Sequence, residues 1–195
     1  MILTVPRTQV RSLPESGCWS ASELDFLQPP LWQPRTQVEH DERYLQPIVY
    51  LVLLNPTGQA WCYQRRGGDG RLDGRWSCGV GGHVDAADAP SGSTFDPATT
   101  LECALLREAH EELGVVAADL PSLQWRGLIY EGLSAVGRVH VGLLYTARWL
   151  HATPPVPRAD EKLVGQGFMD LTTVSSDLRF ELWSRLAGQF LLESA

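Results

Sequence analysis

The sequence predicts one α/β domain with a mixed β-sheet, on three observations. The chain has 195 residues, a length that fits a single domain with at most an extension. Its hydrophobic fraction of 44% is enough to build a core. Short apolar runs bounded by Gly and Pro are interspersed with two segments of helical periodicity. This order is typical of a mixed-sheet α/β or α+β domain.

The predicted strands begin at residue 47. Residues 48–54 are a continuous apolar run between two prolines, which indicates a buried strand. Gly58 predicts a turn into the next strand. The remaining strands are expected at residues 60–65, 75–84 (broken by glycines), 123–131, 139–149 and 163–169.

Two helices are predicted, at residues 100–113 and 176–192. Thr99 and Glu102 have capping-box spacing, so we expect Thr99 to be the N-cap of the first helix, and Gly114 suits its end. The second helix carries an apolar stripe that should face the sheet. Its members are Leu178, Leu182, Trp183, Leu186 and Phe190.

Residues 1–46 are expected to be an irregular arm that packs on the main domain, residues 47–195. Five prolines interrupt this arm, and only residues 22–28 have a short helical pattern. The first residues lack the apolar region of a signal peptide, and no segment approaches about 20 consecutive apolar residues. We therefore expect a cytoplasmic protein with no membrane partner.

The chain is acidic, with 23 Asp+Glu against 16 Lys+Arg and a formal net charge of −7. This balance argues against a nucleic-acid polymer as partner. Most of the charge is local, because residues 85–112 hold seven acids and one base, Arg107, which gives −6 and leaves −1 elsewhere. A bound cation would make such a segment compatible with a small phosphorylated substrate.

Three acids of the first helix lie where they do not favour helix stability. Glu108, Glu111 and Glu112 span about 100° of the helical wheel beside the apolar stripe. Glu108 and Glu112 are a like-charge pair, and the macrodipole disfavours each anion in this half by about 0.3–1 kcal/mol. A hard divalent cation, Mg²⁺ or Mn²⁺, would explain them as ligands. The alternative is a solvated acidic face with Arg107 as an ordinary ion-pair partner.

Two neighbouring segments favour the metal-site interpretation. Residues 79–84 are glycine-rich, which lets backbone approach a ligand or metal closely. Upstream, four arginines and two aspartates lie within eleven residues and leave a local charge of +2. We interpret the arginines as a substrate phosphate clamp, with a solvated turn as the alternative. These candidate substrate-binding residues are Arg65, Arg66, Arg71 and Arg75.

Residues 107–115, REAHEELGV, match the REUxEExGU half of the Nudix box, in which U is aliphatic. Residues 81–84, GGHV, resemble the loop that opens the box. The sequence therefore resembles the Nudix hydrolase family over about residues 46–192. The resemblance implies an α/β/α sandwich with a mixed β-sheet between helices. It also implies Mg²⁺-dependent hydrolysis of a diphosphate linked to another moiety, with Mn²⁺ as a possible substitute, and is compatible with a homodimer.

The resemblance also implies roles for individual residues. Glu108, Glu111 and Glu112 would be metal ligands, Gly82 would offer its backbone carbonyl to a metal, and Arg107 would orient the glutamates through an ion pair. In this family a carboxylate outside the box often acts as base or additional ligand. Glu161 is our candidate, with Asp160 second and Glu131 weaker, so the candidate catalytic residues are Arg107, Glu111 and Glu161. We interpret His83 and His110 as incidental.

The sequence departs from the family pattern in the first half of the box. Eight residues before Arg107 the family has Glu, and this chain has Thr99. Gly82 precedes Thr99 by 17 positions where the box has 6, so eleven extra residues lie within the segment 85–98. Asp85, Asp88 and Asp96 of this insertion are candidates for a substitute carboxylate.

Taken together, the sequence predicts a metal-dependent pyrophosphohydrolase that cleaves a diphosphate linkage in a nucleoside diphosphate derivative or similar small molecule. One alternative is a Nudix-fold ligand-binding or regulatory module that has lost catalysis, motivated by Thr99 and the insertion. Another is an isomerase of the same fold acting on an isoprenoid diphosphate, because Cys78 lies near where such enzymes carry a catalytic Cys.

Overall fold

The computed structural model describes residues 1–10, 13–21, 23–67, 72–92 and 94–194. The strands are β1 (Ile2–Pro6), β2 (Ser16–Trp19), β3 (Leu31–Gln33), β4 (Tyr44–Leu54), β5 (Ala60–Arg65), β6 (Trp76–Ser77), β7 (Gly79–Val80), β8 (Gln124–Glu131), β9 (His140–Arg148) and β10 (Leu163–Met169). The α-helices are α1 (Arg35–Val38), α2 (Pro97–Leu113), α3 (Leu171–Ser176) and α4 (Leu182–Glu193). Short 3₁₀ turns are η1 (Arg7–Gln9), η2 (Asp25–Leu27), η3 (Ala86–Asp88), η4 (Ala117–Asp119) and η5 (Gly137–Val139).

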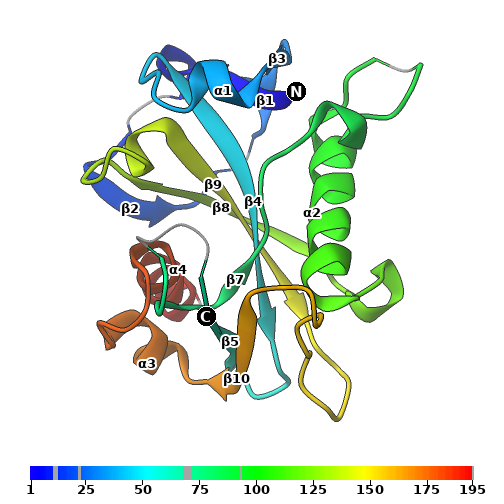
Figure 1. Ribbon diagram of the computed structural model, residues 1–195, viewed down its shortest axis with the longest axis vertical. Coiled ribbons are helices and arrows are strands. Elements are labelled where there is room, and N and C mark those ends of the chain that lie inside the picture. Colours follow the sequence, from blue (N-terminus) through cyan, green and yellow to red (C-terminus); the bar gives the residue numbers. More distant parts are fainter. Residues whose placement is uncertain (11–12, 22, 68–71, 93, 195) are drawn as a thin grey trace.

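The strands form one mixed sheet with α2 on one face and α3 and α4 on the other (Figure 1). The main strand order is β10-β5-β4-β9-β8-β2, in which β4 and β9 are parallel. The predicted α/β/α sandwich with a mixed sheet is therefore confirmed.

Strand β4 lies at the centre of the sheet and is buried on both faces, as its continuous apolar run predicts. Val49, Leu51 and Leu53 belong to the core beneath α2. Tyr50 and Val52 belong to a second core that includes residues of α3 and α4. The alternation of side chains along a strand thus divides one apolar run between two cores.

Helix α2 begins earlier than the sequence predicted. Asp96 is its N-cap and accepts from the Thr99 amide at 3.1 Å, and Pro97 occupies the first turn. The expected N-cap at Thr99 is wrong because Asp96 and Pro97 supply the stronger start signal. Gly114 ends the helix in the left-handed conformation, as predicted, with φ of 66°.

The helix predicted at residues 176–192 corresponds to α4, which begins six residues later, at Leu182, and the short helix α3 that precedes it was not predicted. The chain leaves α3 at Ser176 and re-enters a helix at Leu182, with the Glu181 side chain capping α4. Leu178, expected on the apolar stripe, lies in the connection and is 70% exposed. The connection instead buries Phe180, which makes an edge contact with Trp76 at 5.7 Å between ring centroids.

The N-terminal residues are more regular than expected. Strand β1 pairs with β3 and β4, and β2 extends the sheet by pairing with β8. The helix expected at 22–28 is only the 3₁₀ turn η2 within the described residues. These strands are too short for periodicity to reveal, and their partners are distant in sequence. In the described part of the chain, no helix is both long enough and apolar enough to cross a membrane.

Candidate functional site

The last two turns of α2 present the three predicted glutamates at different depths. The Glu108 side chain is 15% exposed, whereas the Glu111 side chain is 52% exposed. Glu112 is partly buried, and its Oε2 atom is inaccessible to solvent. The helix therefore directs two carboxylates inward and one toward solvent.

Arg107 joins two of these carboxylates to a third acid. Its Nη1 donates to Glu108 Oε1 at 2.7 Å and to Glu111 Oε2 at 3.2 Å. Its Nε and Nη2 donate to the two carboxylate oxygens of Asp88 at 2.8 and 3.0 Å, and Nη2 also donates to the His83 carbonyl at 2.9 Å. A guanidinium has five N–H donors, so these five acceptors use all of them.

Glu112 is the most perturbed acid of the helix. Burial raises the pKa of its carboxyl from 4.5 to about 7, and the nearby negative charges of Glu108 and Glu161 add to this rise. Arg65 and a hydrogen bond from the Gly81 amide act in the opposite direction. Glu112 Oε2 is nevertheless one of three buried side-chain atoms among the described residues that have no hydrogen-bond partner. A buried, unpartnered carboxylate oxygen suits a cation ligand.

The glycine loop brings backbone against these acids. A Cβ atom on Gly82 would lie 2.5 Å from Glu108 Oε1, and Gly81 has φ of 151°, which side chains rarely adopt. The Gly82 carbonyl accepts from the Val49 amide at 3.0 Å, which leaves one lone pair for a metal. The glycines and the Glu112 oxygen therefore fit the predicted metal site. In the described ranges, no three His, Cys, Asp or Glu side chains are already gathered as a metal-binding group.

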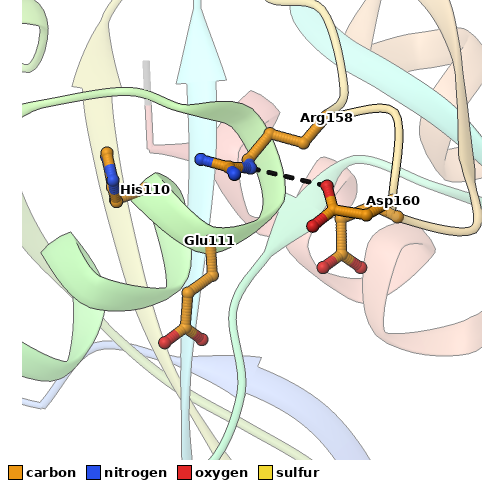
Figure 2. A pocket seen from close by; sticks show the side chains of 5 residues that line it. His110, Glu111, Arg158 and Asp160 are labelled. Atoms are coloured by element: carbon orange, nitrogen blue, oxygen red, sulfur yellow. Dashed lines mark ion pairs between the residues drawn. The ribbon is translucent and has the colours of Figure 1, made fainter.

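The segment before β10 forms the other wall of the site. The Arg158 amide donates to the Glu112 carbonyl at 2.9 Å and so holds this segment on the C-terminal end of α2. Between them lies a cavity of about 380 Å³. Figure 2 shows the side chains that line it. Its lining residues are His110 and Glu111 of α2 with Arg158, Asp160 and Glu161. The candidate base Glu161 thus lies in the same cavity as Glu111, and it is near enough to Glu112 to raise the pKa of that carboxyl.

The predicted arginine clamp is only partly assembled at this site. Arg65 is close enough to Glu112 to affect its pKa, and its Nη2 donates to the Tyr63 hydroxyl at 2.9 Å while Nε has no partner. Arg66 is exposed at the end of β5, where its amide donates to the Lys162 carbonyl at 2.8 Å. Arg75 is bonded to the Leu178 carbonyl at 2.8 Å, beside the connection to α4. Arg71 lies outside the described residues.

Several weaker candidates have other contacts. Glu131 is buried and accepts from the Leu133 and Ser134 amides at 2.9 and 3.0 Å, so it holds a turn. His83 makes a 2.9 Å hydrogen bond with Gln46, and burial lowers its pKa to about 3. His110, which we interpreted as incidental, nevertheless lines the cavity. Sequence reasoning missed Arg158, for which the only signal was its place three residues before Glu161.

Cys78 lies away from the acidic helix. It is 1% exposed, belongs to the core shared with α3 and α4, and its amide donates to the Ser184 hydroxyl at 3.0 Å. Burial raises the pKa of its thiol to about 12. The thiol is therefore neither exposed nor activated, which removes the observation that favoured an isomerase.

Comparison with known proteins gives the same class as the fold and the acidic helix. The NUDIX domain family model matches residues 44–187. Protein YmaB of Bacillus subtilis (strain 168) is 30% identical over 162 residues, which are 80% of this chain and 76% of YmaB. The crystal structure of Tm1382 has a TM-score of 0.77 and 25% identity and covers 100% of this chain and 99% of its own.

Two further structures share the fold at lower identity. DR0079 from Deinococcus radiodurans has a TM-score of 0.55 and 20% identity, with coverage of 82% of this chain and 89% of its own. The NUDIX domain of Shewanella oneidensis NrtR, solved with ADP ribose, has a TM-score of 0.52 and 19% identity, with coverage of 89% and 98%.

This chain belongs to the NUDIX domain family and is a Nudix hydrolase. Nudix hydrolases act on small phosphorylated substrates, and the family generally uses a divalent metal such as Mg²⁺.

Proposed function

We propose that this enzyme is an Mg²⁺-dependent pyrophosphohydrolase, with Mn²⁺ as a substitute, which cleaves a diphosphate linkage in a nucleoside diphosphate derivative or similar small molecule. The observation that carries this proposal is the buried Glu112 carboxylate, whose Oε2 has no partner and whose pKa is raised to about 7. A buried acid in that state is costly unless a cation or a proton accompanies it.

Glu112, Glu108 and the Gly82 carbonyl would hold the cation, and Glu111 would contribute from the solvent side of the helix. When bound, such a cation polarises phosphoryl oxygens and lowers the pKa of a water molecule. Arg107 touches no substrate in this proposal, because its five donors are already occupied. Its part is to hold Glu108 and Glu111 in place.

Arg65 and Arg66 would bind the substrate phosphates. Arg65 Nε is buried without a partner, and Arg66 is exposed at the end of the same strand. Guanidinium groups suit phosphate oxygens because they donate two parallel hydrogen bonds. Lys162 adds a third positive charge near Arg65 and Arg66, since its side chain lies beside Gly67.

Glu161 would act as the general base that takes the proton from the attacking water. It lines the cavity, and its negative charge is close enough to Glu112 to raise the pKa of that carboxyl. Glu161→Gln should lower kcat by about 10²–10⁴-fold, which is the usual contribution of a positioned base. Asp160→Asn is the matched control from the same cavity and should stay within twofold. Equal losses in both variants would remove Glu161 as the base.

The substrate class is tested by a panel of nucleoside diphosphate derivatives, which includes ADP-ribose because the NrtR domain was solved with it. Each compound is incubated with Mg²⁺ or Mn²⁺, and phosphorylated products are separated by chromatography. Turnover that stops when EDTA removes the metal would support the proposal. Tight binding of a panel member without turnover would instead favour a ligand-binding or regulatory module.

A further inference from the structure

A second cavity, also of about 380 Å³, lies on the side of the sheet that α3 and α4 cover. The turn after β4 and the adjoining ends of β8 and β9 form its walls, and the start of α3 and the end of α4 complete it. Leu54, Leu171 and Leu191 make its apolar part. In the described part of the chain, it shares no lining residue with the catalytic cavity, in which Glu111 and Glu161 lie.

The alternation of side chains along β9 directs two polar residues, Thr146 and Arg148, into this cavity. Tyr145 and Ala147 belong to the core beneath α2, whereas Leu144 belongs to the core shared with α3 and α4. Thr146 and Arg148 continue the second set, because successive side chains of a strand point to opposite faces. The catalytic cavity is formed by α2, so the two cavities lie on opposite sides of the sheet.

A bulge in β8 adds a second arginine to the cavity. The register of β8 with β9 shifts between Trp125 and Gly127, so Arg126 is an extra residue in the strand. Trp125 packs against the core beneath α2, which directs its neighbour Arg126 to the other face. Gly127 has no room for a side chain, because a Cβ atom there would lie 2.1 Å from the Trp19 carbonyl oxygen.

The two arginines bring positive charge that no acid of the cavity balances. Among the described residues, neither Asp nor Glu lines it. Within the same ranges Arg126 and Arg148 form no ion pair, and the Arg126 guanidinium donates only to Gln124 Oε1, at 3.3 Å. Arg107 and Arg138, by contrast, each pair with an acid at 2.8 Å or less. Two guanidiniums therefore keep free donors at one cavity of a chain whose net charge is −7.

The chemistry of the cavity suits a phosphate group that carries an apolar ring. Two neighbouring guanidiniums can donate several charge-assisted hydrogen bonds to phosphate oxygens. The Gln124 amide and the Ser122 and Thr146 hydroxyls are further polar groups of the lining, and the leucines offer apolar contact. The volume falls within the range of about 300–1,000 Å³ that is usual for small-molecule sites.

We infer that this cavity is a second binding site, separate from the catalytic one, for a nucleoside phosphate. Arg126 and Arg148 bind the phosphate group, and the apolar part formed by Leu54, Leu171 and Leu191 receives the base. The site lies beyond the proposed function and does not depend on it, because neither arginine belongs to the catalytic cavity.

The test is calorimetry of the full chain with AMP in the presence of EDTA, which keeps metal from the catalytic cavity. AMP should bind at one site per chain. Adenosine and inorganic phosphate should each bind at least about tenfold more weakly, because each lacks one of the two groups that the cavity recognises. The double variant Arg126→Gln with Arg148→Gln should weaken AMP binding by about tenfold or more.

Two control variants distinguish this cavity from other arginines. Arg43→Gln changes an exposed arginine that pairs with Asp41 elsewhere on the surface, and it should leave AMP affinity within about twofold. Arg66→Gln changes a proposed phosphate ligand of the catalytic site, and it should also leave AMP affinity in EDTA within about twofold. The thermal unfolding midpoint of the double variant should stay within about 2 °C of wild type, because neither guanidinium is in an ion pair.

Three results would overturn the inference. They are the absence of AMP binding by the wild type, equal affinity for inorganic phosphate and AMP, and loss of binding in Arg66→Gln while the double variant still binds. Failure of the proposed function would instead be seen as a lack of metal-dependent turnover, which leaves the titrations in EDTA unchanged. The two failures are therefore distinguishable.

Discussion

Two glutamates at opposite faces of the sheet have opposite environments. Glu181, before α4, caps that helix by accepting from the Trp183 and Ser184 amides. It also accepts from the hydroxyls of Tyr50 and Ser184 at 2.7 and 2.8 Å. Glu112, in the last turn of α2, has a buried oxygen without a partner and lies at the negative end of its helix.

This difference in hydrogen-bond partners and in position on the helix means that Glu181 stabilises the fold, whereas Glu112 does not. At a helix N-terminus the macrodipole and free amides stabilise a carboxylate. At the C-terminal end of α2 the macrodipole is reversed, and the hydrogen bond from the Gly81 amide leaves Oε2 without a partner, so the ionised Glu112 carboxylate lowers the stability of the metal-free protein. Such a cost is typical of functional sites.

The largest expected effect is on activity. Glu112→Gln should lower kcat/KM by about 10³-fold or more, because a lost cation contact removes several kcal/mol of transition-state stabilisation. Glu181→Gln should leave kcat/KM of the folded protein within about threefold. Both are measured by steady-state kinetics on the same substrate, with the folded fraction determined by circular dichroism. Similar losses of kcat/KM in both variants would contradict the assignment of Glu112 to the active site and of Glu181 to the stability of the fold.

The second expected effect is on stability, where the change at Glu181 should matter more than the change at Glu112. Glu181→Ala should lower the free energy of unfolding by about 2–4 kcal/mol, since it removes a helix cap and leaves buried hydroxyl groups of Tyr50 and Ser184 with fewer partners. Urea unfolding followed by tryptophan fluorescence measures this. A loss below about 0.5 kcal/mol would show that Glu181 is not needed for the packing of α4.

The pH dependence of the free energy of unfolding should show the raised pKa of Glu112. Its folded pKa, about 7, exceeds its ordinary value of 4.5, so the folded state holds a proton that the unfolded chain releases first. This contribution is full below pH 4.5 and is lost as pH rises through 7. Metal-free wild type should therefore lose on the order of 3 kcal/mol of stability between pH 4.5 and 8 relative to Glu112→Gln.

Added Mg²⁺ supplies the control for that comparison. At pH 8 it should raise the unfolding temperature of the wild type, because a ligand that binds only the folded state stabilises it. The Glu112→Gln variant should respond weakly or not at all. Identical pH profiles for the two metal-free proteins would show that Glu112 ionises normally.

The smallest expected effect is at Cys78. Cys78→Ser should change kcat by less than about twofold, because the thiol packs in the core under α4 and not beside Glu112. Its stability cost should be about 1 kcal/mol, as expected when a small apolar group is exchanged for a buried hydroxyl. A large loss of activity without unfolding would restore the isomerase interpretation.

Much of the fold follows from local pattern. The boundaries of β5 and β10 agree with the predicted residues 60–65 and 163–169, and β4 contains the predicted run 48–54. The predictions of helix boundaries were wrong where two local sequence signals favour different boundaries. Asp96 and Pro97 overrode the capping spacing at Thr99, and the connection at residues 177–181 interrupted an apparently continuous apolar stripe.

The candidate site was partly predictable for the same reason. Helical spacing alone places Glu108, Glu111 and Glu112 together, because the 3.6-residue repeat is a local property. It could not choose among Asp85, Asp88 and Asp96 as the acid of the insertion, nor show that Arg158 docks on the end of α2. Those contacts join residues whose separation is set by loops and sheet pairing.

By itself, the sequence determined the long strands after residue 46, the helices α2 and α4, the acidic face of α2 and the family to which that face belongs. Only the tertiary structure decided that Glu112 is buried beside Glu161 and Arg65, and that Asp88 reaches Arg107. The physical reason is that hydrogen-bonding periodicity belongs to a segment, whereas the burial and electrostatic environment of a side chain depend on every other segment that covers it.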